Sequence, residues 1–145
     1  MKRLHVHVAV EDIPYAVRFY STLFAQEPAV VKSDYAKWML DDPRVNFAVS
    51  TRGKQPGLDH LGIQAENQDE LAEVYGRLGR AGSTVREVGP TVCCYAKSEK
   101  AWIDDPAGIA WETFFTTGDS TIYGDSSHEP GGEAHIARAK SCCAQ

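Results

Sequence analysis

Three side chains capable of binding a metal ion occur at related places in the sequence. His5 lies in the segment Leu4–Asp12, and His60 takes the same place in a similar segment 55 positions later. Glu112 lies among the aromatic residues of 109–115, where an unpaired carboxylate would be costly to bury. Two imidazoles and one carboxylate can hold Fe(II) and leave coordination positions open for O2 and a substrate. The three residues are therefore a candidate iron site.

His7 competes with His5 for a place in this site. The two side chains are two residues apart, so they share one face if the segment is a strand. An alignment of the two histidine segments matches His5 with His60. It matches His7 with Gly62. The alignment therefore favours His5 as the ligand and predicts that His7 lines the cleft wall or contacts the ligands.

All four cysteines occur as two adjacent pairs, Cys93-Cys94 and Cys142-Cys143. Adjacent cysteines close only a strained disulfide ring, so we expect thiols in a reducing compartment. Two neighbouring thiols can hold a soft ion or a thiophilic centre. For the second pair we expect a nonessential scavenging role.

The surroundings of Cys93 and Cys94 leave two interpretations open. In a regular strand, adjacent side chains point to opposite faces, and the pair would be two small packed hydrophobes. Gly89 and Pro90 lie just upstream and predict a turn, and a loop at this place would direct both sulfurs inward. A nearby cation such as Lys100 would favour the thiolate form.

The histidine segments must be positioned by regular elements. Both alternate apolar and polar residues, which is typical of half-buried strands. A helix is expected after each one, because apolar residues then recur at helical spacing. Asp12 predicts the start of the first helix, with Pro14 in its first turn. The second helix is expected to start at Asn67 or Asp69 and to stop at Gly82.

Each unit then closes with strands around an Asp-Pro turn. The segment 38–43 resembles 102–106, and a short apolar run follows each. The repeat predicts an α+β fold of two pseudo-symmetric βαβββ modules, about 1–54 and 57–117, that share a metal-binding cleft. We expect a single domain over 1–118, because each module is too small to be stable alone.

The same repeat places Ala48 opposite Glu112. A site with four protein ligands would need an acid or an amide near Ala48, and alanine offers neither. The repeat therefore predicts three ligands and open coordination positions.

Charge and hydropathy narrow the function classes. The 145 residues include 15 basic and 20 acidic side chains, for a net charge of −5, and the basic stripe of a nucleic-acid-binding protein is missing. No apolar run approaches the ~18 residues that span a bilayer, and Glu11 and Asp12 end the first apolar run too early for a secretion signal. We therefore expect a cytoplasmic protein that binds neither nucleic acid nor membranes. Residues 119–145, rich in Gly, Ser and His, predict a flexible tail.

Together these features resemble the vicinal oxygen chelate superfamily, which has the glyoxalase/extradiol-dioxygenase fold. Within it, about residues 2–124 resemble the ArsI/CadI-type heavy-metal resistance proteins. The motifs that carry the resemblance lie at 33–48, 57–64, 93–96 and 108–114.

The resemblance implies an enzyme, a non-haem Fe(II)- and O2-dependent carbon–arsenic lyase. Such enzymes degrade trivalent organoarsenicals, namely methylarsenite and aromatic arsenicals, and release arsenite. It also implies that His5, His60 and Glu112 hold the iron and that Cys93 and Cys94 bind the arsenic. The resemblance is compatible with a homodimer as well as with a monomer.

Three alternatives share part of this pattern. A cadmium- or heavy-metal-binding resistance protein would use the same thiols without turnover. An extradiol-type dioxygenase would use the same metal ligands and would not need adjacent cysteines. A glyoxalase-like isomerase or thiol transferase would be expected to need a fourth ligand where this chain has Ala48.

Overall fold

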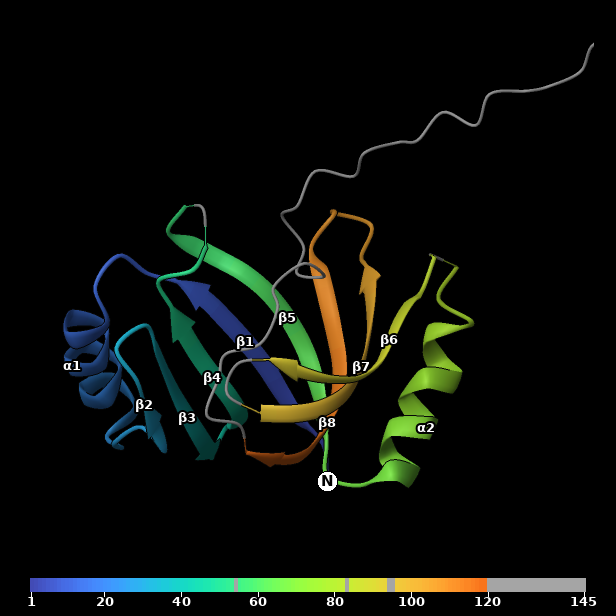
Figure 1. Ribbon diagram of the computed structural model, residues 1–145, viewed down its shortest axis with the longest axis horizontal. Helices are drawn as coiled ribbons and strands as arrows, with labels where there is room; N and C mark the ends of the chain where they lie inside the picture. The colour runs from blue at the N-terminus through green and yellow to red at the C-terminus, as the bar shows by residue number, and fades with distance from the viewer. Residues whose placement is uncertain (54, 83, 94–95, 120–145) are drawn as a thin grey trace, which may run out of the picture.

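The computed structural model describes residues 1–53, 55–82, 84–93 and 96–119, with the backbone alone for 87–93, 96–98 and 119. The first half of this chain contains β1 (Arg3–Ala9), α1 (Ile13–Phe24), β2 (Val30–Val31), β3 (Tyr35–Asp41) and β4 (Arg44–Ser50). The second half contains β5 (Gly57–Ala65), α2 (Gln68–Leu78), β6 (Arg86–Cys93), β7 (Ala96–Asp104) and β8 (Ala110–Asp119). The order βαβββ thus occurs twice (Figure 1), which confirms the predicted α+β modules.

The two halves meet in one sheet with the strand order β2-β3-β4-β1-β5-β8-β7-β6. β1 and β5 pair antiparallel at its centre. Each also pairs in parallel with the last strand of its own half, β1 with β4 and β5 with β8. His7 lies opposite Ala48 in one half, and Gly62 lies opposite Glu112 in the other. Ala48 and Glu112 therefore occupy equivalent places, as the alignment predicts.

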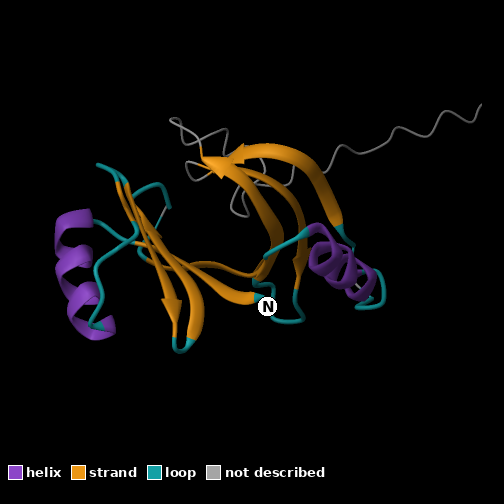
Figure 2. Ribbon diagram, turned by 90° about the horizontal axis from the view of Figure 1, so that it is seen from below, coloured by secondary structure: helices purple, strands orange, loops and turns teal. Residues whose placement is uncertain are grey.

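The two helices lie on the outer side of this curved sheet (Figure 2). Val6 and Val8 of β1 pack against the apolar cluster beneath α1. His5 and His7 alternate with these valines along β1 and are buried, and alternation sends their side chains to the opposite face. The polar face of β1 is thereby turned towards the cleft.

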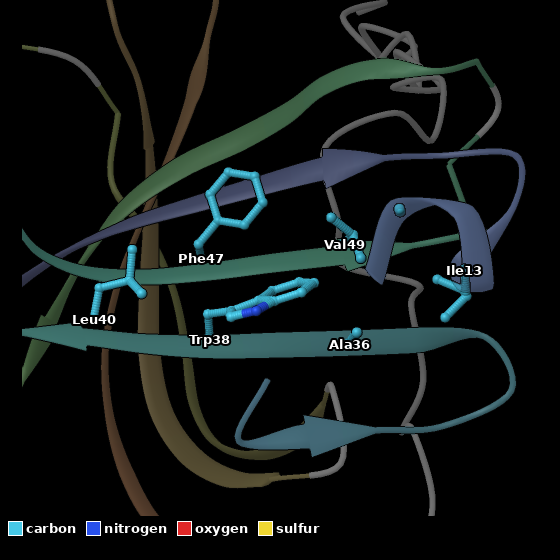
Figure 3. Close-up of a cluster of buried hydrophobic side chains, with 7 residues drawn as sticks. Ile13, Ala36, Trp38, Leu40, Phe47 and Val49 are labelled. Carbon is cyan, nitrogen blue, oxygen red and sulfur yellow. The ribbon is translucent and has the colours of Figure 1, made fainter. Parts of the chain in front are cut away.

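The first half is held together by a core under α1 (Figure 3). The Asp12 side chain accepts a hydrogen bond from the backbone N–H of Tyr15, and Pro14 lies in the first turn, so the predicted helix start is confirmed. The buried residues of the core are Ile13, Ala16, Ala36, Trp38, Leu40, Phe47 and Val49. Burial of each large side chain contributes roughly 1.5–3 kcal/mol.

Helix α2 covers β5 and β8 in the second half. Its N-cap is Asn67, which accepts a hydrogen bond from the backbone N–H of Glu70, so the choice left open between Asn67 and Asp69 is resolved. The predicted stop at Gly82 is wrong, because α2 ends at Leu78. Backbone hydrogen bonds three residues apart close the chain into turns over 77–81, as is common where a helix ends.

The far end of the second half bends over the inner face of the sheet. The pairing of β7 with β8 shifts between Lys97 and Ser98, and that of β6 with β7 shifts between Glu87 and Gly89. Such irregularities bend and twist a sheet. In both views, β6 and β7 curve over the inner face (Figures 1 and 2).

The predicted turn at Gly89 and Pro90 is wrong, because β6 continues through both residues to Cys93. β6 is an edge strand, and proline is tolerated there since its missing N–H removes no hydrogen bond to a second neighbour. A loop that directs both sulfurs inward therefore cannot begin at this dipeptide.

Two further expectations concern the surroundings of the domain. Among the residues that the structure describes, no helix is long and apolar enough to cross a membrane. The flexible tail predicted for 119–145 lies outside the described residues from 120 onwards.

We predict that Gly62→Ala destabilises the protein and distorts the metal site. An added Cβ would lie 2.4 Å from the carbonyl oxygen of Glu112 and 3.3 Å from the Cβ of His5. Such overpacking should lower the free energy of unfolding by about 1–3 kcal/mol. Gly76→Ala is the matched control, because its Cβ meets nothing within 4 Å and alanine favours a helix by about 1 kcal/mol. Urea unfolding that gave the two variants equal stability would contradict this account.

Candidate metal centre

The structure brings the side chains of His5, His60 and Glu112 together on the inner face. The two Nε2 atoms lie 3.2 Å apart, and Oε2 of Glu112 lies 3.9 Å from that of His5 and 3.6 Å from that of His60. Two nitrogens bound to one tetrahedral ion would be roughly 3.3 Å apart. The three donor atoms are therefore grouped closely enough to share an ion after a small contraction, and their role as ligands stays a prediction.

Each of these imidazoles is held from behind by its other ring nitrogen. Nδ1 of His5 lies 3.1 Å from the carbonyl oxygen of Asn46, and Nδ1 of His60 lies 2.5 Å from Oδ1 of Asp59. Metal-binding histidines usually donate their second N–H to such acceptors, which fixes the ring and its tautomer. Both Nε2 atoms are thus directed towards the cleft.

Glu112 is also held by a cation. Nζ of Lys100 lies 2.6 Å from Oε1 of Glu112, and both residues are buried. The ammonium lies 5.6 Å from the centre of the Trp102 ring. One carboxylate oxygen therefore binds the lysine and the other faces the histidines. The expected role of Lys100 as a neighbour of the thiols misses this ion pair, although alternation along a strand places Lys100 and Trp102 on one face.

Aromatic rings close the sides of the site. The Phe114 ring meets the His5 ring edge to face at a centroid distance of 5.2 Å. The Trp102 ring meets the His60 ring in the same manner at 5.0 Å. These walls restrict the imidazole orientations and keep the donor atoms away from bulk water.

His7 lies beside the same group. One ring nitrogen from each of His5, His7 and His60 lies within 4.8 Å of the other two. The His7 and His60 rings are 4.7 Å apart, and Nε2 of His7 lies 2.9 Å from Oγ of Ser50. His7 is thus a neighbour of the predicted ligands, on the same face as sequence analysis expects.

His60 is the protonated imidazole of the metal-free site. Burial by itself lowers its pKa, but hydrogen bonding to Asp59 and Glu112 outweighs this and raises the pKa to about 9. Its Nδ1–H then donates to Asp59, and its Nε2–H is directed towards Nε2 of His5 at 3.2 Å and Oε2 of Glu112 at 3.6 Å. A metal ion would have to displace the latter proton, because a ligating imidazole offers a lone pair.

The other titratable groups are shifted in the opposite sense. Burial, with the charge of His60, lowers the pKa of His5 to about 4. Burial, with His60 and His5, lowers the pKa of His7 to about 3. Burial opposes ionisation of Glu112, yet the charges of Lys100 and His60 hold its pKa well below the usual range. Near neutral pH, therefore, two neutral imidazoles lie beside an imidazolium and a carboxylate.

The cysteine pair is described only in part. Cys93 is the last residue of β6, and its backbone alone is described. Cys94 lies outside the described residues. The assignment of this pair as the arsenic-binding site therefore stays a prediction.

Comparison with known proteins agrees with this architecture. Residues 2–113 match the sequence model of the Glyoxalase/Bleomycin resistance protein/Dioxygenase superfamily. A solved structure with the same fold is the Mn(II)-bound glyoxalase from Novosphingobium aromaticivorans, with a TM-score of 0.58 and 16% identity over 86% of this chain and 43% of that chain.

Two curated relatives are similar over nearly the whole chain. The trivalent organoarsenical cleaving enzyme of Bacillus sp. (strain MD1) is 38% identical over an alignment of 149 positions, gaps included. The alignment covers 98% of this chain and 91% of the relative. The cadmium-induced protein CadI of Mycobacterium tuberculosis (strain ATCC 25618 / H37Rv) is 32% identical over 145 residues, which cover 99% of this chain and 93% of the relative.

We predict that the stability of the metal-free protein is greatest near pH 6.5. Below this pH, His5 and His7 bind protons in the unfolded chain but stay neutral in the folded protein. The free energy of unfolding therefore falls as the pH drops towards 4. Above it, folded His60 keeps a proton that the unfolded chain loses, so stability falls as pH rises towards 9. Since one pKa unit corresponds to about 1.4 kcal/mol, the alkaline loss should be about 3 kcal/mol.

Urea unfolding across this pH range, with a chelator present, measures both effects. His60→Gln should abolish the alkaline loss and leave the acid loss in place. A profile of the unsubstituted protein that stays level between pH 6.5 and 9 would show that His60 is not held as an imidazolium.

Proposed function

Because the chain belongs to the Glyoxalase/Bleomycin resistance protein/Dioxygenase superfamily, we propose that it is a carbon–arsenic lyase that requires Fe(II) and O2. It removes the methyl or aryl group from trivalent organoarsenicals and releases arsenite. One observation carries the proposal. Two imidazole nitrogens and one carboxylate oxygen meet at a buried site, in a chain 38% identical to an organoarsenical cleaving enzyme.

His5, His60 and Glu112 would hold the iron. Two imidazoles and one carboxylate form the donor set of non-haem Fe(II) oxygenases, which keep positions open for O2 and substrate. Bound Fe(II) would supply the binding and activation of O2 beside the carbon–arsenic bond. The inward direction of both Nε2 atoms and of Oε2 supports this assignment.

Lys100 has a positioning role in this proposal. Its ammonium holds Oε1 of Glu112, so Oε2 would be the carboxylate oxygen available to the iron. The rings of Phe114 and Trp102 exclude water around the ligands. The lysine and the aromatic rings would together leave coordination positions on the iron available to O2 and substrate.

Cys93 and Cys94 would bind the arsenic. Trivalent arsenic is soft and thiophilic, so two thiolates would take two of its bonds and the third bond would keep the carbon group. Cys93 ends β6, in the part of the sheet that curves over the inner face (Figure 1). This curvature supports delivery of the substrate towards the iron. A cytoplasmic location would keep both thiols reduced.

A second candidate is a heavy-metal-binding resistance protein without turnover. The similarity to the cadmium-induced protein favours it, since imidazoles and thiolates also bind cadmium. The two candidates use the same residues and differ in whether a product is formed.

We predict that the protein, loaded with Fe(II) and exposed to air, converts methylarsenite to arsenite. Cys93→Ser with Cys94→Ser should lower this turnover by at least about 100-fold, because the substrate is no longer oriented. Cys142→Ser with Cys143→Ser is the matched control and should leave turnover unchanged. Chromatographic quantification of both arsenic species measures the outcome. Tight stoichiometric binding of methylarsenite without arsenite release would support the second candidate instead.

We predict that Glu112→Ala loses Fe(II) and also loses stability. The substitution removes the carboxylate that neutralises the buried Lys100 ammonium, at a cost of about 3–5 kcal/mol. The double variant Glu112→Gln with Lys100→Met removes both charges and should regain most of that stability without regaining Fe(II). Urea unfolding and iron analysis after desalting measure the two effects. A double variant that bound iron normally would exclude Glu112 as a ligand.

A further inference from the structure

We propose that His7 provides a second metal site that overlaps the first. In this site His5, His7 and His60 would bind a divalent ion that prefers nitrogen, such as Zn(II), and Glu112 would stay on Lys100. The two sites share His5 and His60, so one ion excludes the other. The proposal concerns metal selection and goes beyond the proposed lyase activity.

The first argument is that His7 is held in the same way as the two predicted iron ligands. His5 and His60 each bind an acceptor with the nitrogen that faces away from the group, namely the Asn46 carbonyl and the Asp59 carboxylate. Nε2 of His7 is likewise engaged by the Ser50 hydroxyl. All three imidazoles therefore have an outer hydrogen bond that orients the ring, as metal-binding histidines do.

The second argument is the remaining nitrogen of His7. Its Nδ1 atom is buried and has no hydrogen-bond partner among the described residues. Leaving such an atom without a partner costs about 1–3 kcal/mol. One nitrogen of each of the three rings lies within 4.8 Å of the other two, and Nδ1 is the His7 nitrogen that the Ser50 hydroxyl leaves free for an ion.

The third argument comes from the internal repeat. In the second half, Gly62 has no side chain and lies opposite Glu112, whereas in the first half His7 lies opposite the small Ala48. In the first half the large side chain, His7, is on the first strand, β1. In the second half the large side chain, Glu112, is on the last strand, β8. At this pair of positions the first half therefore carries a nitrogen donor, His7, where the second half carries an oxygen donor, Glu112.

The fourth argument is that three imidazoles form a ligand set without Glu112. Its Oε1 atom binds the Lys100 ammonium at 2.6 Å, and its Oε2 atom lies 3.6 Å or more from the histidines. Three imidazoles are a common complete protein ligand set for Zn(II), with bonds of 2.0–2.1 Å. An ion that prefers nitrogen could therefore bind without disturbing the ion pair. Since Zn(II) has no redox chemistry, that form would not activate O2.

The test compares the affinities of the full-length protein for Zn(II) and, without oxygen, for Fe(II). His7→Gln should weaken Zn(II) binding by at least about 100-fold, which exceeds the 10- to 100-fold cost of losing a residue that only orients a ligand. It should change Fe(II) affinity by less than about threefold, because His7 is not an iron ligand in the proposal. The double variant Glu112→Gln with Lys100→Met should show the opposite pattern.

A structural readout accompanies the affinities. The chemical shift of bound 113Cd, used as a spectroscopic substitute for Zn(II), should move in His7→Gln and stay in the Glu112→Gln, Lys100→Met double variant. Circular dichroism and urea unfolding establish that each variant is folded, and His7→Phe repeats the test with a side chain that lacks nitrogen.

Equal loss of Zn(II) and Fe(II) in His7→Gln, or unchanged Zn(II) binding, would overturn the second site. Loss of both ions in the double variant would overturn it as well. These outcomes are separate from the fate of the proposed function, which depends on arsenite release by the iron-loaded protein.

Discussion

The buried ion pair between Lys100 and Glu112 is the interaction on which the candidate site depends. It lets a carboxylate stay charged inside the protein, where an isolated charge would be too costly. It also gives the two carboxylate oxygens different contacts, since Oε1 binds the ammonium and Oε2 faces His5 and His60. His60 in turn keeps a proton near neutral pH because of this charge and that of Asp59. The strand that carries the lysine is therefore as important to the site as the strands that carry its predicted ligands.

The fold supplies this site by joining two similar halves with different contents. Antiparallel pairing of β1 with β5 brings His5 and His7 of one half beside His60 of the other, at the centre of the sheet. The helices bury the apolar residues of the same strands on the outer side (Figure 2), so alternation alone turns the polar residues inward. Bulges then curve β6 and β7 over the inner face. The two halves thus share the same arrangement of strands, and they differ in the donor side chains that these strands carry.

Much of this arrangement could be predicted from the sequence. Strand alternation predicts the face on which His5 and His60 lie, and the repeat predicts that Ala48 and Glu112 are equivalent, as the strand register confirms. These predictions succeed because they depend on local periodicity and on comparison within the chain. The pairing of Lys100 with Glu112 could not be predicted in the same way, because it depends on the register between two different strands, β7 and β8. Edge position is also a long-range property, so the Gly-Pro dipeptide predicts a turn from sequence although it lies within the edge strand β6.

The unequal contents of the halves limit how such a protein can arise by duplication. Two copies of the first half would assemble with His5, His7 and Ala48 repeated, which gives four imidazoles and no carboxylate. Two copies of the second half would repeat His60 and Glu112, which gives two imidazoles and two carboxylates. A symmetric homodimer always presents an even number of each donor, so a single carboxylate is unattainable by parity. A single polypeptide has no such restriction, because each half can carry its own set of donors.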